Sequence, residues 1–248
     1  MVQLVGILNV TPDSFSDGGE FIDPDVAIKR AEQLFKDGAT LVDIGAESTR
    51  PNAEQLSDDQ EWQRLEPILR VVLPKYPGRI SLDSHHVSTF EKAFQIAPVI
   101  INDVTGFQDA ALQYFAVQKQ ATIIISHLPF GMTIQQAHAS ATMNDIQQVK
   151  DELLHTAKHL EDKGLERSSI ILDPGIGFGK TPELNKELVS FAAHVPQYQV
   201  MIGYSRKRFL GEDRMKLEPN IQAAMTAIKS GAVYLRVHDV KGHKRELS

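Results

Sequence analysis

Short apolar runs that end in polar residues recur eight times along the chain and predict β-strands. Several runs are apolar at consecutive positions, which is typical of strands buried on both faces of a parallel sheet. The predicted strands are Leu4–Val10, Thr40–Ile44, Arg79–Asp83, Val99–Val104, Thr122–Ser126, Ile170–Asp173, Val200–Gly203 and Tyr234–Val237.

Stretches with helical periodicity lie between these runs. Asp23 is a suitable N-cap for the first helix, Pro24 suits its first position, and Gly38 can close it. Ser57 and Gln60 have the spacing of a capping box for the second helix. The remaining predicted helices are Val87–Ala97, Asp109–Lys119, Asn144–Lys163, Glu183–His194 and Pro219–Lys229.

Eight alternations of strand and helix in 248 residues match the size of one (β/α)8 TIM barrel, a single domain over residues 1–248. Only the polar segment Asp239–Ser248 follows the last strand, so we expect the last helix to be short or missing. The third and fourth strands begin about 20 residues apart, which is tight for a barrel unit. A doubly wound open sheet is therefore the alternative fold.

The composition narrows the class of protein. Hydrophobic residues make up 42% of the chain and charged residues 23%, as in a soluble globular protein. Cysteine is absent, which excludes disulfides, cysteine–zinc sites and thiol catalysis. The net charge of −6 disfavours a nucleic-acid partner. No apolar run can cross a membrane and no secretory leader opens the chain, so we expect a cytoplasmic protein without a membrane partner.

Polar residues follow every predicted strand. In a barrel the carboxyl ends of the strands meet at one face, so these residues would form a ring there. Each one alone could equally be a helix cap or a turn former. Together they suit a small polar ligand with a hydrogen-bonding edge and an anionic group. The ring comprises Asn9, Asp43, Glu47–Arg50, Asp83, Asn102, Asp103, Ser126, His127, Asp173, Ser205–Lys207, Arg236, His238 and Asp239.

The segment Gly175–Thr181 looks like a phosphate-binding loop, but Pro174 stands where such a loop needs its first glycine. A tight turn whose glycines let the backbone approach a flat ligand is the favoured interpretation.

Two histidine pairs have metal-ligand spacing. His155 and His159 are four residues apart, but Thr156 stands where zinc proteases carry Glu, so a solvated helix face is favoured. His85 and His86 follow the third strand, and without nearby partners in the sequence a loop role is favoured for them.

Six sequence blocks, in one order along nearly the whole chain, resemble the dihydropteroate synthases, a family of pterin-binding barrels. The blocks are Gly6–Gly19, Glu47–Pro51, Ile101–Val104, Asp173–Lys180, Ser205–Lys207 and Arg236–Val240. The resemblance implies condensation of 6-hydroxymethyl-7,8-dihydropterin diphosphate with 4-aminobenzoate in folate biosynthesis. This is an alkyl transfer that gives 7,8-dihydropteroate and diphosphate. It also implies a Mg²⁺ cofactor, a homodimer and inhibition by sulfonamides.

The resemblance assigns site residues by position. The pterin would contact Asp83, Asn102, Asp173 and Lys207. The diphosphate would contact Asn9, Arg50, Arg236 and His238, and Asn9 would also bind the metal. The aminobenzoate would contact Phe15, Thr49, Pro51 and Arg208. The catalytic residues would be Asp17, Lys207, Arg236 and His238.

The chain also departs from the family pattern. Arg208 stands where the family usually has Ser, and the text after the fifth strand, Ser126–Phe130, differs from the usual run. A pterin-binding paralogue without catalysis is therefore an alternative. A methyltetrahydrofolate methyltransferase is a weaker one, because it has no need for the anion-binding positions Arg236 and His238. The short last helix also allows the chain to be one domain of a fused folate enzyme.

Overall fold

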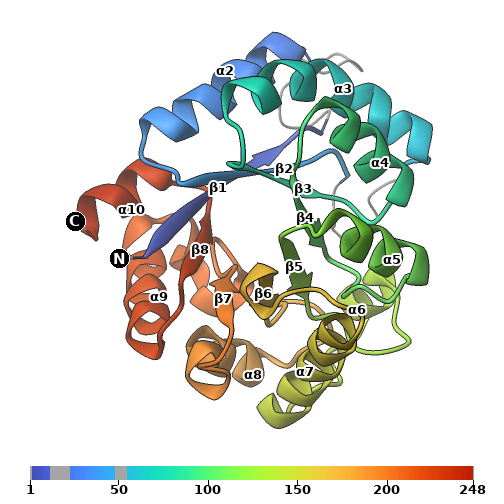
Figure 1. The fold of residues 1–248 in the computed structure, drawn as a ribbon. Helices are drawn as coiled ribbons and strands as arrows, with labels where there is room; N and C mark the ends of the chain where they lie inside the picture. The colour runs from blue at the N-terminus through green and yellow to red at the C-terminus, as the bar shows by residue number, and fades with distance from the viewer. Residues whose placement is uncertain (1, 12–22, 48–54, 248) are drawn as a thin grey trace.

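The structure is a computed structural model that describes residues 2–11, 23–47 and 55–247. Eight parallel strands close into a barrel in sequence order, with β1 paired to both β2 and β8 (Figure 1). The predicted barrel is confirmed, and the open-sheet alternative is wrong because β8 closes on β1. The strands are β1 Gln3–Asn9, β2 Leu41–Gly45, β3 Ile80–Asp83, β4 Ile100–Asp103, β5 Ile123–Ser126, β6 Ile170–Asp173, β7 Gln199–Ile202 and β8 Tyr234–Val237.

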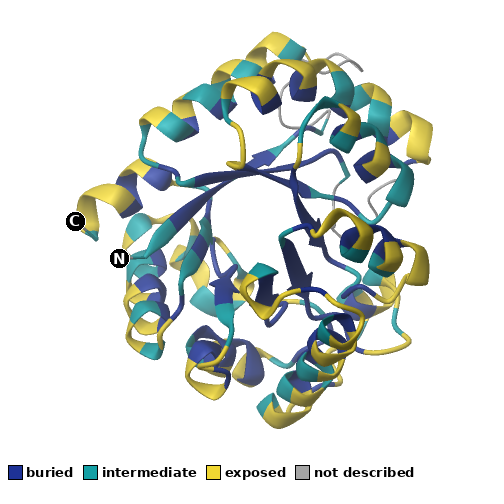
Figure 2. Cartoon of the chain, viewed as in Figure 1, coloured by how far each residue is buried: buried dark blue, intermediate teal, exposed yellow. Residues whose placement is uncertain are grey.

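Helices surround the barrel and turn their buried faces toward the strands (Figure 2). The predicted helix over residues 183–194 is in fact two elements, because the α-helix ends at Glu187 and a 3-10 helix follows from Leu188 to His194. Within that 3-10 helix, Ser190 has non-helical angles (φ −98°, ψ 16°). The α-helices are α2 Pro24–Lys36, α3 Asp58–Lys75, α4 Val87–Ile96, α5 Ala110–Lys119, α6 Ile134–Ala139, α7 Ile146–Asp162, α8 Pro182–Glu187, α9 Leu217–Ser230 and α10 Val240–Glu246. The 3-10 helices are η1 Arg167–Ser169, η2 Leu188–His194, η3 Arg208–Leu210 and η4 Glu212–Met215.

Side-chain caps begin several of these helices. The side chain of Asp23 accepts a hydrogen bond from the backbone of α2, and Ser57 with Gln60 forms the predicted capping box of α3. A second capping box, Thr133 with Gln136, begins α6, a helix that the hydrophobic pattern did not predict. A capping box fixes two backbone donors at once, so it can begin a helix as short as α6.

The last helix is short, as the sequence predicts. α10 has seven residues, and the carboxylate of Asp239 caps it by accepting from Gly242 N at 2.8 Å. A side chain at Gly242 would overlap the Asp239 carboxylate and crowd Leu217. The glycine therefore lets the chain turn directly from β8 into its closing helix.

Candidate active site

The inside of the barrel has two layers. An apolar layer toward the amino ends of the strands consists of Val5, Leu41, Ile100, Ile124, Ile171 and Met201, with Tyr234 packed against it. Because side chains on a strand alternate between faces, the residue two positions further along points to the same side. On five strands that residue is polar: Asp43, Asn102, Ser126, Asp173 and Arg236. This polar layer lies toward the carboxyl ends of the strands, where barrel enzymes bind their substrates.

Asp43 is the hub of the polar layer. Its carboxylate accepts from Arg236 Nε at 2.6 Å, from Ser81 Oγ at 2.5 Å and from Asn102 Nδ2 at 3.1 Å and 3.2 Å. These bonds join β2 to β3, β4 and β8 across the barrel interior. Asp43 belongs to the predicted ring of polar residues, but no specific role was predicted for it. The signal for one was a single carboxylate within the apolar run Leu41–Gly45.

Arg236 lies between two carboxylates. Besides its bond to Asp43, its terminal nitrogen donates to Asp83 Oδ2 at 2.9 Å. Burial opposes the charge of Arg236, but Asp43 and Asp83 outweigh it and raise the pKa of the guanidinium. Arg236 is thus a permanent cation at the carboxyl end of the barrel. The predicted contact with the diphosphate stays a prediction.

The two remaining carboxylates of the site carry raised pKa values. Burial, with the charge of Asp43 second, raises the pKa of Asp83 to about 7, although Arg236 opposes this. Burial also raises the pKa of Asp173, whereas the Lys207 ammonium acts to lower it. One Asp173 oxygen accepts from Gly175 N at 2.7 Å, which fixes the orientation of the carboxylate. A bound cationic or N–H-rich ligand would favour the charged form of both groups.

Lys207 lies in the loop after β7, close to the Asp173 and Asp83 carboxylates. Its ammonium donates to the carbonyl oxygen of Ile176 and lies 5.3 Å from the centre of the Phe178 ring. Burial lowers the pKa of Lys207 to about 8, and the Asp173 carboxylate opposes the shift. The structure thus brings Lys207, Asp173, Asp83 and Arg236 together, as the sequence predicts.

The turn after β6 depends on glycine. Gly175 has φ +62°, and a Cβ there would overlap the carbonyl oxygen of His127. Gly177 has φ +92°, and its missing side chain leaves room for the stem of Lys207. The glycines therefore allow the turn to pack against the end of β5 and leave room for Lys207. The predicted tight turn is present, and its approach to a flat ligand stays a prediction.

Lys180, the lysine of this turn, makes hydrogen bonds within the protein. It is buried, and its Nζ donates to the carbonyl oxygens of Phe178 at 2.9 Å and His127 at 3.2 Å. Burial, with Lys207 nearby, lowers its pKa to about 7. Beside it, the His127 ring contacts Glu152 at 3.1 Å, and burial lowers the pKa of that imidazole to about 4. Lys180 and His127 therefore tie the glycine turn to β5.

Three further predicted site residues lie within the described part of the chain. His238 Nδ1 lies 2.9 Å from Ser205 Oγ, which links the ends of β7 and β8. Asn9 ends β1 in register with Gly45, and Gly45 packs against Asp83. Arg208 is exposed at the start of η3. The remaining five lie outside the described residues: Phe15, Asp17, Thr49, Arg50 and Pro51.

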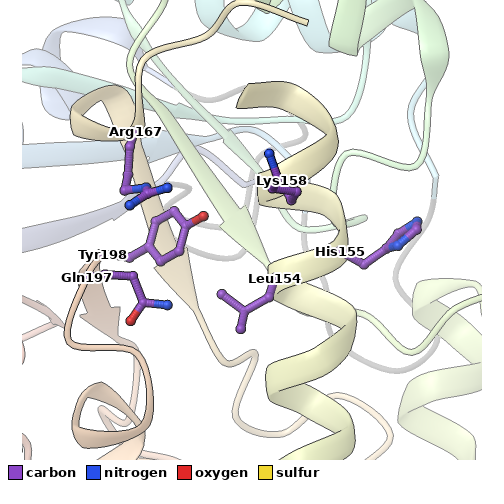
Figure 3. A pocket seen from close by; sticks show the side chains of 6 residues that line it. All are labelled: Leu154, His155, Lys158, Arg167, Gln197 and Tyr198. Atoms are coloured by element: carbon purple, nitrogen blue, oxygen red, sulfur yellow. The ribbon is translucent and has the colours of Figure 1, made fainter. Parts of the chain in front are cut away.

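A hollow on the outer surface lies away from this polar layer, between α7 and the segment before β7 (Figure 3). Two of its polar groups are already engaged, since Glu161 pairs with Arg167 at 2.8 Å and accepts from Tyr198 at 2.7 Å. His155 and His159 on α7 are exposed, which confirms a solvated helix face. The hollow is lined by Leu154, His155, Lys158, Arg167, Gln197 and Tyr198.

A family model described as pterin binding enzyme matches residues 5–238. The chain is 34% identical to a dihydropteroate synthase of Clostridium beijerinckii, over 98% of this chain and 90% of the relative. It is 35% identical to the Bacillus subtilis dihydropteroate synthase, over 96% and 84% of the two chains. The chain belongs to the dihydropteroate synthase family. Its activity is therefore that of the family, a transferase reaction of folate biosynthesis.

Solved dihydropteroate synthases share the fold. The Xanthomonas albilineans enzyme, solved with 4-aminobenzoic acid, has a TM-score of 0.87 at 28% identity, covering 99% of this chain and 90% of that one. The Yersinia pestis enzyme, solved as a sulfonamide drug complex, has a TM-score of 0.88 at 28% identity, covering 98% and 91%. The Thermus thermophilus enzyme in complex with 6HMPPP has a TM-score of 0.82 at 31% identity, covering 99% and 92%.

Within the described part of this chain, no helix combines the length and apolarity needed to cross a membrane.

Proposed function

We propose that the polar layer of the barrel binds 6-hydroxymethyl-7,8-dihydropterin diphosphate and directs its condensation with 4-aminobenzoate. The observation that carries this is the meeting of Asp173, Lys207 and Arg236 at the carboxyl ends of β6, β7 and β8. An acid, a lysine with a lowered pKa and a permanent cation thus face one space. The 6HMPPP and 4-aminobenzoic acid bound to solved relatives support this choice of substrates.

The pterin ring is held by the acids and the amide. A pterin edge presents an amino group and a ring N–H, and a carboxylate accepts two such donors in a charge-assisted pair. Asp173 serves as this acceptor, and Asp83 completes the edge. The bonds from Asn102 Nδ2 to Asp43 fix the amide orientation, so Asn102 Oδ1 is an acceptor for the ligand. Lys207 donates to the carbonyl side of the ring.

The reaction breaks the bond between the methylene carbon and the diphosphate oxygen and forms a bond from that carbon to the aminobenzoate nitrogen. The amine loses a proton, and diphosphate leaves with the electron pair of the broken bond. Positive groups placed where this charge develops stabilise the departing anion. Among the described residues, we propose Arg236 as the cation and the His238 imidazole as a hydrogen-bond donor, with Arg50 beside them. Phe15, Asp17, Thr49, Pro51 and Arg208 remain the proposed aminobenzoate side of the site.

Asn9 suits the proposed Mg²⁺. It ends β1 in register with Gly45, and Gly45 packs on Asp83, so we propose that the side-chain oxygen of Asn9 faces the acids of the polar layer. Mg²⁺ prefers oxygen ligands and takes few of them from protein when phosphates are present. When bound, the ion neutralises charge on the diphosphate. We further propose that the chain is a single domain and acts in the cytoplasm. We also propose that it is a homodimer, which sedimentation of the purified protein tests.

The test is an assay of the purified chain with both substrates and Mg²⁺. We expect equal amounts of 7,8-dihydropteroate and diphosphate, and competition between sulfonamides and aminobenzoate. Pterin binding without turnover would favour the non-catalytic paralogue instead. Methyl transfer from methyltetrahydrofolate would favour the methyltransferase.

A further inference from the structure

Three side chains of metal-ligand type meet outside the polar layer. Glu47 lies just after β2, and His85 and His86 lie between β3 and α4. One ligand atom from each lies within 4.8 Å of the other two. His86 Nε2 and Glu47 Oε2 are 3.9 Å apart, and the two imidazole rings have centroids 4.1 Å apart. The sequence showed no partner for the two histidines, and the fold supplies one from β2.

The hydrogen bonds around His86 leave one nitrogen available. His86 Nδ1 lies 2.8 Å from Asp58 Oδ1, so in the neutral imidazole its proton is on Nδ1 and points to that carboxylate. The lone pair on Nε2 then faces Glu47. Both His86 Nε2 and Glu47 Oε2 are buried and have no hydrogen-bond partner among the described residues. Two buried acceptors that face each other are unfavourable unless a cation or a proton lies between them.

We propose that Glu47, His85 and His86 bind a divalent first-row transition-metal ion, with Zn²⁺ as the representative. Two imidazoles and one carboxylate are a ligand set that Zn²⁺ takes, with the fourth position open to water. The contact from Asp58 to His86 is the carboxylate behind the imidazole that commonly orients such a ligand. With metal–ligand bonds of about 2.0–2.2 Å, tetrahedral ligand atoms lie roughly 3.3–3.6 Å apart. Small rotamer changes that draw the three side chains together are therefore part of binding.

The surroundings favour a cation. Glu61 lies beside the cluster, where its carboxylate accepts from Ser84 Oγ at 2.7 Å and from Thr89 Oγ1 at 2.5 Å. Its second oxygen, Oε1, is buried without a hydrogen-bond partner in the described part of the chain. Glu61, Glu47 and Asp58 thus place three carboxylates around the two histidines. Arg64 is a nearby cation that interacts with Glu47. A bound ion would offset this excess of negative charge and join the ends of β2 and β3.

The experiment measures Zn²⁺ binding by calorimetry and Co²⁺ binding by its visible absorption, with excess Mg²⁺ present to saturate all-oxygen sites. The variants are His86→Gln, Glu47→Gln and Asp58→Asn, and the control is the double variant His155→Gln/His159→Gln. Melting temperatures without metal show which variants fold. Because the readout is metal binding, it separates this proposal from the proposed synthase mechanism.

We expect one Zn²⁺ per chain in the wild type and in the control. His86→Gln and Glu47→Gln should weaken binding by more than about tenfold, and Asp58→Asn by about tenfold. Equal affinity in all variants, loss in the α7 control alone, or no binding by the wild type would overturn the proposal. If His86→Gln does not fold, X-ray absorption of the Zn²⁺-loaded wild type decides: two imidazole nitrogens support the site, and an all-oxygen shell contradicts it.

Discussion

Arg236 donates from Nε to Asp43 Oδ2 at 2.6 Å, inside a barrel that keeps the Asp43 side chain fully buried. The pair connects β8 to β2 across β1, so two strands that are not neighbours are joined by an ion pair. The same Asp43 carboxylate orients Asn102, a proposed pterin ligand. Asp43, which has no proposed substrate contact, thus positions Arg236 and Asn102, which both have one.

We expect Asp43→Asn to lower the free energy of unfolding by about 2–4 kcal/mol, because the partly buried Arg236 guanidinium loses one of its two hydrogen-bonded carboxylates and keeps Asp83. Urea denaturation at neutral pH measures the loss. Pterin binding should also weaken, since Asn102 loses its charged acceptor. The matched control is Asp213→Asn, which breaks an exposed pair with Lys216 and should change stability by less than about 1 kcal/mol. Equal effects of the two substitutions would refute the role of Asp43.

Lys207→Met tests the lowered pKa of Lys207. A lysine with a folded pKa of about 8 and an ordinary unfolded pKa of 10.5 binds its proton more weakly in the folded state. Its burial penalty is therefore fully present below pH 8 and disappears as the pH rises toward 10.5. We expect the variant to be more stable than the wild type below pH 8, with the difference shrinking up to pH 10.5, while pterin binding and turnover are both lost.

Chemical denaturation at several pH values measures this difference. Lys158→Met, at an exposed lysine of α7 paired with Asp162, is the control and should show no such gain below pH 8. A stability difference between wild type and Lys207→Met that does not change with pH would contradict the lowered pKa. Undiminished turnover would remove Lys207 from the proposed mechanism.

Gly175→Ala should be among the most damaging small substitutions in the chain. The new methyl group would overlap the carbonyl oxygen of His127, and the backbone has φ +62°, which side-chain-bearing residues rarely adopt. We expect a loss of more than about 3 kcal/mol in thermal or urea unfolding, with the glycine turn displaced from β5. Gly78→Ala, at φ +71° in open space, isolates the backbone effect and should lose only about 1 kcal/mol. Similar losses at both glycines would show that the contact with His127 is unimportant.

Asp83→Asn tests whether a carboxylate with a pKa of about 7 accepts hydrogen bonds from the pterin. Since the ionised form is the acceptor, we expect 6-hydroxymethyl-7,8-dihydropterin to bind more tightly as the pH rises through 7. Using the pterin without its diphosphate removes phosphate titration from the measurement. The amide variant should bind more weakly and with a flatter pH profile, and an unchanged profile would show that another group is responsible.

Strand positions were predictable from the sequence because barrel strands are buried on both faces and read as short apolar runs. All eight predicted strands lie within a few residues of the observed ones, and Ile170–Asp173 and Tyr234–Val237 coincide. The meeting of Asp173, Lys207 and Arg236 was predictable for the same reason, since parallel strands bring their carboxyl ends to one face.

Other features depend on contacts that no local pattern contains. The positioning role of Asp43 depends on the pairing of β8 with β1, which brings Arg236 within hydrogen-bonding distance of Asp43. The cluster of Glu47 with His85 and His86 likewise requires the register that pairs β2 with β3. α6 is too short for a helical period to be visible, and its capping box, Thr133 with Gln136, was the one local signal.

The most direct test of the central claim is a crystal structure of the chain soaked with 6-hydroxymethyl-7,8-dihydropterin diphosphate. We predict that the pterin edge hydrogen-bonds to the Asp173 carboxylate, with Lys207 on its carbonyl side and the diphosphate toward Arg236 and His238. A pterin bound outside the barrel, or one inside it without a contact to Asp173, would contradict the account.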